Sequence, residues 1–131
     1  MSHCILIEVK DVTGKTDSTV GLIDIYDVFG LASQTIQGAD LLAARLNAVV
    51  MIPDFFEGDA LEHSVVPPDT DEKMKRIGDF LATSGNFERN VGVLLESMPE
   101  YRRRFPSVVK WGANGFCWGG KVSNPFMSDW A

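Results

Sequence analysis

The feature that most constrains the fold is an alternation between short apolar runs and longer segments with helical spacing. Apolar, β-favouring runs occupy residues 19–26, 48–52 and 107–114, and a weaker run occupies 4–9. Apolar residues recur at helical spacing over 34–46, 70–82 and 86–98. Strands that alternate with helices predict an α/β fold, with a mostly parallel sheet and helices on both of its faces.

Prolines and polar stretches mark the expected breaks between these segments. Residues 11–18 are polar and contain a glycine, so we expect a turn there. We expect Ser33 to cap the first helix, and Pro99 to end or kink the third. Because Pro125 interrupts residues 122–131, we do not expect that stretch to continue as a helix.

A glycine-flanked cysteine follows the last apolar run, in the segment 115–121 (GFCWGGK). This is the pattern of a nucleophile elbow, with Cys117 where serine is more common. A sharp turn from strand to helix needs small neighbours on either side, which Gly115 and Gly119 supply. Negative charge on the sulfur would be favoured at the N-terminus of the following helix.

The residues of this segment allow two other interpretations. The segment also fits the phosphate-binding pattern G-x-x-x-x-G-K, but Val122 stands where a magnesium-binding serine or threonine is needed. The residues around Cys117 are equally typical of a buried structural cysteine in a glycine-rich turn. The local sequence does not separate the structural cysteine from the nucleophile.

Composition narrows the class of protein. The chain has 131 residues, of which 45% are hydrophobic and 23% charged, which indicates one folded domain. A formal net charge of -6 disfavours nucleic acid and anionic membranes as partners. The sequence contains two cysteines, Cys4 and Cys117, and no signal-peptide pattern, so we expect a cytoplasmic protein without disulfides. We expect no cofactor and no metal.

Several segments together resemble the dienelactone hydrolase family of the α/β-hydrolase fold, and its fungal members in particular. The resemblance covers roughly residues 19–121. It rests on 25–30 (IYDVFG), 37–40 (QGAD), 53–58 (PDFFEG), 67–70 (PPDT) and 115–121 (GFCWGGK). It implies a hydrolase of ester or lactone bonds with a small-molecule ester or lactone as substrate. It also implies that the strand at 19–26 lies between the strands at 48–52 and 107–114.

The resemblance also implies roles for individual residues. Cys117 matches the nucleophile, and the backbone N–H groups of Val28 and Trp118 match the two donors of the oxyanion hole. Asp27 stands where the family has a glutamate that interacts with the resting cysteine. Its shorter side chain is equally typical of a carboxylate that caps a loop.

The chain departs from the family after the elbow. Family members are longer and complete their triad with an aspartate and a histidine on later loops. We therefore expect residues 1–131 to be a single, incomplete domain with weak activity. His63 lies in the long connection after the strand at 48–52, where the family has no base, and His3 lies near the N-terminus.

Two non-hydrolytic alternatives remain. In the first, a truncated or spliced form binds or oligomerises without turnover. The strand before Cys117 would then be an exposed edge, and we expect a homo-oligomer through it. In the second, Cys117 is a redox-sensing thiol, although the sequence offers no evident resolving cysteine.

Overall fold

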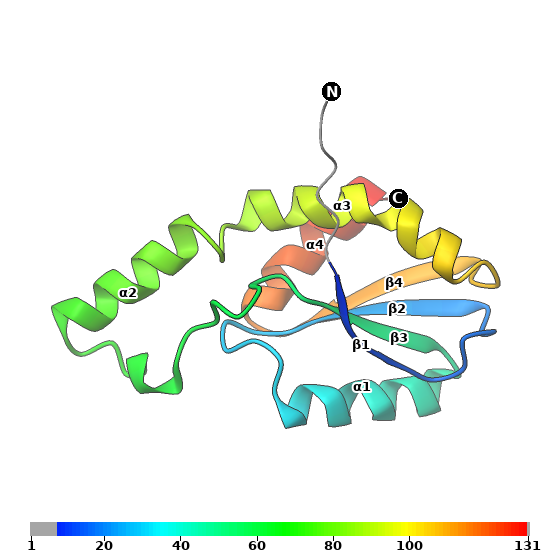
Figure 1. Cartoon of the computed structure of the whole chain (residues 1–131), viewed down its shortest axis with the longest axis horizontal. Helices are drawn as coiled ribbons and strands as arrows, with labels where there is room; N and C mark the ends of the chain where they lie inside the picture. The colour runs from blue at the N-terminus through cyan, green and yellow to red at the C-terminus, as the bar shows by residue number, and fades with distance from the viewer. Residues whose placement is uncertain (1–7, 131) are drawn as a thin grey trace.

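A four-stranded sheet organises the computed structural model, which describes residues 8–130 (Figure 1). The strands are β1 (Val9–Thr13), β2 (Val20–Ile25), β3 (Val49–Pro53) and β4 (Lys110–Gly115). The helices are α1 (Ser33–Leu46), α2 (Asp71–Ala82), α3 (Phe87–Arg104) and α4 (Trp118–Trp130), with a short 3-10 helix η1 (His63–Val65).

The sheet is mixed, with strand order β1-β3-β2-β4. β2 pairs in parallel with β3 and β4, whereas β1 pairs antiparallel with β3. The fold is therefore α/β, β2 has the expected central place, and the expectation of a mostly parallel sheet was wrong. The antiparallel pairing of β1 has a physical reason. Only a short connection without a helix joins β1 to β2, too short for the crossover that strands in the same direction need, so the chain reverses direction between them. Because β3 is parallel to β2, β1 is antiparallel to β3.

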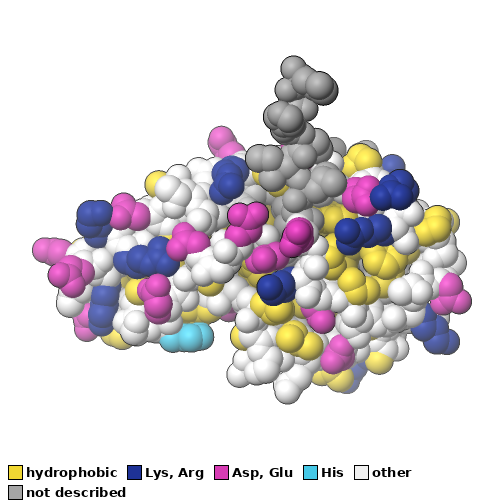
Figure 2. All heavy atoms as spheres, in the orientation of Figure 1, with side chains coloured by type: hydrophobic (Ala, Val, Ile, Leu, Met, Phe, Trp, Pro, Cys, Tyr) yellow, Lys and Arg dark blue, Asp and Glu magenta, His cyan; other side chains and the backbone are white. Residues whose placement is uncertain are grey.

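Helices cover the two faces of the sheet unequally. Figure 1 shows α1 on one face and α3 and α4 on the other. All five residues of β3 are buried, because this strand lies between two others and under helices on both sides. Helix α2 lies beside the end of the sheet rather than over a face (Figure 1). Charged side chains of both signs lie on this part of the surface (Figure 2). Lys73 pairs with Asp69, and Lys75 pairs with Asp79.

Prolines end neither of the two long C-terminal helices. Helix α3 continues past Pro99 to Arg104, and α4 contains Pro125. A helix-interior proline removes a hydrogen bond and costs about 3 kcal/mol. Burial offsets that cost, because the side chains just after the prolines, Tyr101 and Phe126, are fully buried. The expectation that 122–131 would not be helical was therefore wrong as far as Trp130.

The expected N-terminal elements also need correction. Of the weak strand at 4–9, residues 4–7 lie outside the described part of the chain. β1 begins at Val9 and takes in residues that we expected to form a turn. Ala32, rather than Ser33, is the N-cap of α1. Thr70 caps α2, and its side-chain oxygen accepts a hydrogen bond from the Lys73 N–H at 3.1 Å. No helix within residues 8–130 is long and apolar enough to cross a bilayer.

Candidate functional site

Cys117 occupies the turn between β4 and α4. The strand ends at Gly115 and the helix begins at Trp118. Cys117 has a φ of 55°, in the left-handed region, and its side chain is exposed. A non-glycine residue in this conformation costs roughly 1–2 kcal/mol. The thiol therefore lies on a strained turn at the carboxyl edge of the sheet and is not a buried structural cysteine.

Two glycines make this turn possible. A Cβ at Gly115 would overlap the backbone of Gly119, and its distance to the Gly119 Cα would be 2.9 Å. A Cβ at Gly119 would overlap the carbonyl oxygen of Ile25 and lie 2.8 Å from that of Tyr26. The start of α4 thus packs backbone to backbone against the end of β2, which only glycine permits.

The loop after β2 lies at the same edge of the sheet. Ile25, the last residue of β2, is in register with Gly115 of β4, so Asp27 and Val28 follow β2 close to the turn that carries Cys117. The Val28 carbonyl accepts a hydrogen bond from the Leu61 N–H at 2.9 Å, which fixes the loop. The topology therefore brings the two predicted oxyanion-hole segments to one edge.

Asp27 shapes its own loop. Its Oδ1 accepts a hydrogen bond from the backbone N–H of Phe29 at 2.9 Å, and its carbonyl accepts one from Gly30 at 3.1 Å. This is the turn-closing role of an aspartate side chain. The sequence left two roles open for Asp27, as a partner of the resting thiol or as a loop cap. These hydrogen bonds are those of a loop cap.

Trp118 anchors the first turn of α4 in an aromatic cluster. Its indole Nε1 donates a hydrogen bond to the Gly85 carbonyl at 2.7 Å. Its ring lies edge-on to Phe55 and Phe56, with centroid distances of 5.6 and 4.7 Å, and stacks on Phe87 at 6.0 Å. Because the indole is fixed, the backbone amide that follows Cys117 is fixed with it.

A hollow of about 370 Å³ opens beside this turn. Its lining includes Asp24 and Asp27 from the β2 side, Asn114 and Phe116 from the β4 side, and Gln34 and Leu42 from α1. The Asp24 carboxyl is buried, and its Oδ1 accepts a hydrogen bond from Asn114 Nδ2 at 3.1 Å. Burial raises the pKa of Asp24, and the Asn114 hydrogen bond opposes that shift in part.

Sequence reasoning missed the pair of Asp24 and Asn114. A signal was available, because an aspartate inside an otherwise apolar strand run marks a buried polar group that needs a partner. The partner could not be found without the register between β2 and β4, which places the two residues opposite each other.

The histidines do not join this arrangement in the described residues. His63 lies in η1, and its ring stacks on Phe29 with a centroid distance of 4.1 Å. His3 lies outside the described residues. Within residues 8–130, no three His, Cys, Asp or Glu side chains are grouped so that they could hold a metal ion.

Comparison with known proteins gives two curated relatives, and no family model matches the chain. Both relatives are uncharacterized AIM2 family proteins of Schizosaccharomyces pombe. One is 38% identical over 111 residues, which cover 85% of this chain and 44% of the relative. The other is 36% identical over 110 residues, which cover 84% of this chain and 44% of the relative. The chain thus spans less than half the length of these relatives.

These relatives contradict the expected family. They are named as AIM2 family proteins and not as dienelactone hydrolases, so that assignment was wrong. The ester- or lactone-hydrolase activity inferred from that assignment, in which Cys117 would be the nucleophile, was wrong for the same reason. Short glycine-rich motifs specify the backbone of turns, and one backbone supports unrelated chemistries. What the comparisons establish is that most of this chain is similar to AIM2 family proteins, whose names assign no activity.

Proposed function

We propose that this chain binds small carbonyl compounds, above all aldehydes, through a reversible covalent bond to the Cys117 sulfur and without turnover. The observation that carries the proposal is the exposed thiol on a left-handed turn, with φ at 55°. Backbone strain of this kind persists where the surrounding structure enforces it, and it clusters at ligand-binding positions. Here Gly115 and Gly119 enforce it through direct backbone packing.

The proposed step needs no further reactant. The Cys117 sulfur forms a bond with the carbonyl carbon, and the π electron pair of the carbonyl moves to its oxygen. The thiol proton ends on that oxygen, which gives a hemithioacetal. No group leaves, so the reverse step releases the unchanged aldehyde.

Two backbone amides are proposed to hold the oxygen of the adduct. Trp118 begins α4, and the first amides of a helix have no acceptor within the helix. Val28 follows β2 at the same sheet edge, and the Leu61 hydrogen bond holds its carbonyl, on the peptide that follows the proposed amide donor. Two hydrogen bonds of about 0.7 kcal/mol net each correspond to about a tenfold gain in affinity.

The neighbouring hollow supports a small organic ligand. Its volume of about 370 Å³ lies in the range of pockets that hold such molecules. Phe116, one residue before the thiol, gives it an apolar wall, whereas Asn114 and Asp24 add polar groups to its lining. We propose that Asp27 holds the loop around the ligand rather than the thiol, since its Oδ1 already accepts the Phe29 amide.

The test uses a Cys4→Ser variant, in which Cys117 is the remaining cysteine. It is titrated with benzaldehyde labelled with ¹³C at the carbonyl carbon. A hemithioacetal moves that carbon from the carbonyl region of the NMR spectrum to the region of saturated carbons. Protection of Cys117 from alkylation by iodoacetamide gives a second reading of the same affinity.

The matched control moves the thiol to another helix start. Thr70 is exposed and caps α2 with an ordinary φ of -131°. A Cys4→Ser/Cys117→Ser/Thr70→Cys variant therefore keeps the helix terminus but loses the strained turn and the two amides. We expect about tenfold weaker binding of benzaldehyde there. Equal affinity at the two positions, or no adduct at Cys117, would refute the proposal.

A further inference from the structure

The 59–63 segment, which lies between β3 and α2 in the chain, holds the loop that offers the Val28 amide. The Leu61 N–H donates to the Val28 carbonyl at 2.9 Å, and the Leu61 side chain is buried. The rings of Phe29 and His63 stack beside this bond, with a centroid distance of 4.1 Å. Two consecutive residues of the loop are therefore in direct contact with the 59–63 segment.

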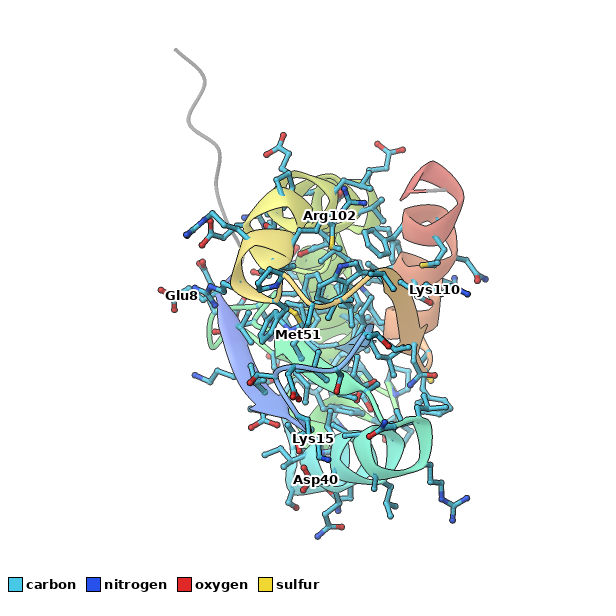
Figure 3. The ribbon with its side chains drawn as sticks, turned by 90° about the vertical axis from the view of Figure 1, so that its right-hand side faces the viewer. Glu8, Lys15, Asp40, Met51, Arg102 and Lys110 are labelled. Carbon is cyan, nitrogen blue, oxygen red and sulfur yellow. The ribbon has the colours of Figure 1, made fainter. Side chains whose placement is uncertain are left out.

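The same loop is closely packed at its tip and fixed at its base. Gly30 has a φ of 78°, and a Cβ there would lie 3.0 Å from the Cβ of Ala60. The base of the loop is the end of β2, a strand that pairs on both sides. Figure 3 shows Met51, on the adjacent β3, between helices α1 and α3. Since these layers hold the base, the 59–63 segment acts on the tip.

One arginine of α2 contacts the 59–63 segment at three points. Its Nη2 atom lies 3.2 Å from the Ala60 carbonyl oxygen, 3.4 Å from Asp59 Oδ1 and 3.3 Å from Glu62 Oε1, and the residue is Arg76. The hydrogen bond from Arg76 lowers the pKa of Glu62. The three acceptors lie on both sides of Leu61, so a single cation holds the backbone that presents the Leu61 N–H.

Arg76 is itself held in place by the packing of α2. Its guanidinium lies over the ring of Phe80, 6.0 Å from the centroid, and that ring is fully buried. Phe80 in turn meets Phe56 edge-on, with a centroid distance of 4.8 Å. Asp59 accepts a second hydrogen bond, from Ser84 Oγ just after α2, at 2.7 Å. Helix α2 and the 59–63 segment are thus joined at both ends of the helix's second half.

We propose that Arg76 is a positioning residue for the site at Cys117. It clamps the 59–63 segment on both sides of Leu61, which keeps the Leu61 N–H against the Val28 carbonyl. The loop that offers the Val28 amide is thereby held in place. This inference rests on the proposed function, in which that amide is one of two donors to the adduct. Among the described residues, those that line the hollow do not include Arg76, so its influence passes through the segment.

The first test needs no ligand and follows hydrogen exchange of backbone amides by NMR. An amide exchanges through the local opening that breaks its hydrogen bond, so Arg76 affects Leu61 only if its contacts break in that opening. We expect Arg76→Gln to speed exchange at Leu61 about fivefold, because several partly exposed ion pairs contribute modestly together. The Ser18 amide, which donates to the Lys15 carbonyl in the turn between β1 and β2, is expected to keep its rate.

The matched control is Lys75→Gln, which removes the same charge from the next residue of α2. Lys75 pairs with Asp79 inside the helix at 2.7 Å and is expected to leave Leu61 exchange unchanged. Sodium chloride at about 1 M gives the same perturbation without a substitution, because it screens ion pairs beyond about 3 Å. We expect it to speed Leu61 exchange in the wild type and in Lys75→Gln, and not in Arg76→Gln. Circular dichroism confirms that both variants are folded.

The second test measures binding of the labelled benzaldehyde on the Cys4→Ser background. We expect Arg76→Gln to weaken the adduct at Cys117 by about threefold, which is the share of one of the two amides. Arg76→Lys keeps the charge and is expected to recover part of this loss, whereas Lys75→Gln should bind as the parent does.

Unchanged Leu61 exchange in Arg76→Gln would overturn the inference, whether or not the parent chain forms an adduct. Faster exchange at Leu61 with undiminished affinity for benzaldehyde would overturn it as well, because the loop would then be held without consequence for the site. Absence of an adduct in the parent refutes the proposed function instead. In that case the exchange rate of Leu61 alone decides whether Arg76 holds the loop.

Discussion

Gly119→Ala tests the backbone packing that shapes the turn at Cys117. The added Cβ would overlap the Ile25 carbonyl oxygen and lie 2.8 Å from that of Tyr26 and 3.0 Å from the Ile25 carbonyl carbon. All three atoms belong to the backbone at the end of β2, so no side chain can rotate away. Relief requires α4 to move off the sheet.

The magnitude follows from two opposing effects. Overpacking a filled site costs typically 1–3 kcal/mol, and backbone neighbours place this position at the upper end. Alanine in a helix gains at most about 1 kcal/mol over glycine. We therefore expect a net loss of about 2 kcal/mol in the free energy of unfolding. For a domain of this size that lowers Tm by roughly 6–10 °C.

The assay is urea unfolding followed by circular dichroism at low micromolar protein, with Gly92→Ala as the matched control. Gly92 lies inside α3, and a Cβ there would meet nothing within 4 Å. The control is therefore expected to gain up to about 1 kcal/mol, so the two variants should shift the midpoint in opposite directions. If Gly119→Ala were as stable as the wild type or the control, the close packing of α4 on β2 would be refuted.

Three further substitutions probe neighbouring groups. Tyr26→Phe removes the hydroxyl that accepts the Phe56 N–H at 2.9 Å, so urea unfolding should show a loss of about 1–3 kcal/mol; no loss would mean that water replaces the hydroxyl. Burial raises the pKa of Asp24, so its contribution to stability is present below its ordinary pKa and is lost as pH rises through the raised value. Asp24→Asn should therefore be more stable than the wild type near neutral pH, and unfolding across pH 4–8 should show that this advantage shrinks at the acid end; a constant difference would contradict this. Cys117→Gly should be about 0.5–1 kcal/mol more stable than Cys117→Ala, which keeps the left-handed strain, and equal Tm values would exclude that strain.

The elements that sequence could predict are those in which local pattern and tertiary packing agree. The runs that became β2 and β3 are apolar because both strands are central, and the glycines around Cys117 could be read as a tight turn. The helix through Pro125 could not be predicted, because the burial of Phe126 that offsets the proline is a tertiary contact. The antiparallel pairing of β1 also depends on a distant partner.

The candidate site was predictable in position and not in chemistry. Alternating strands and helices bring the loops at Val28 and Cys117 to one sheet edge, and this follows from topology alone. Asp24 was missed because its importance depends on Asn114, ninety residues away. The hydrolase inference failed because it transferred an activity along with a backbone motif.

The position of Trp118 gives the molecule an internal optical reporter. Its indole is adjacent in sequence to the thiol, packs on Phe56 and donates to the Gly85 carbonyl. Gly85 lies between α2 and α3, so one ring senses both the turn that carries the sulfur and the corner where two helices meet. The chain has three tryptophans, so once Trp111 and Trp130 are replaced by phenylalanine its fluorescence emission follows chemistry at Cys117 and motion at that corner without any added label.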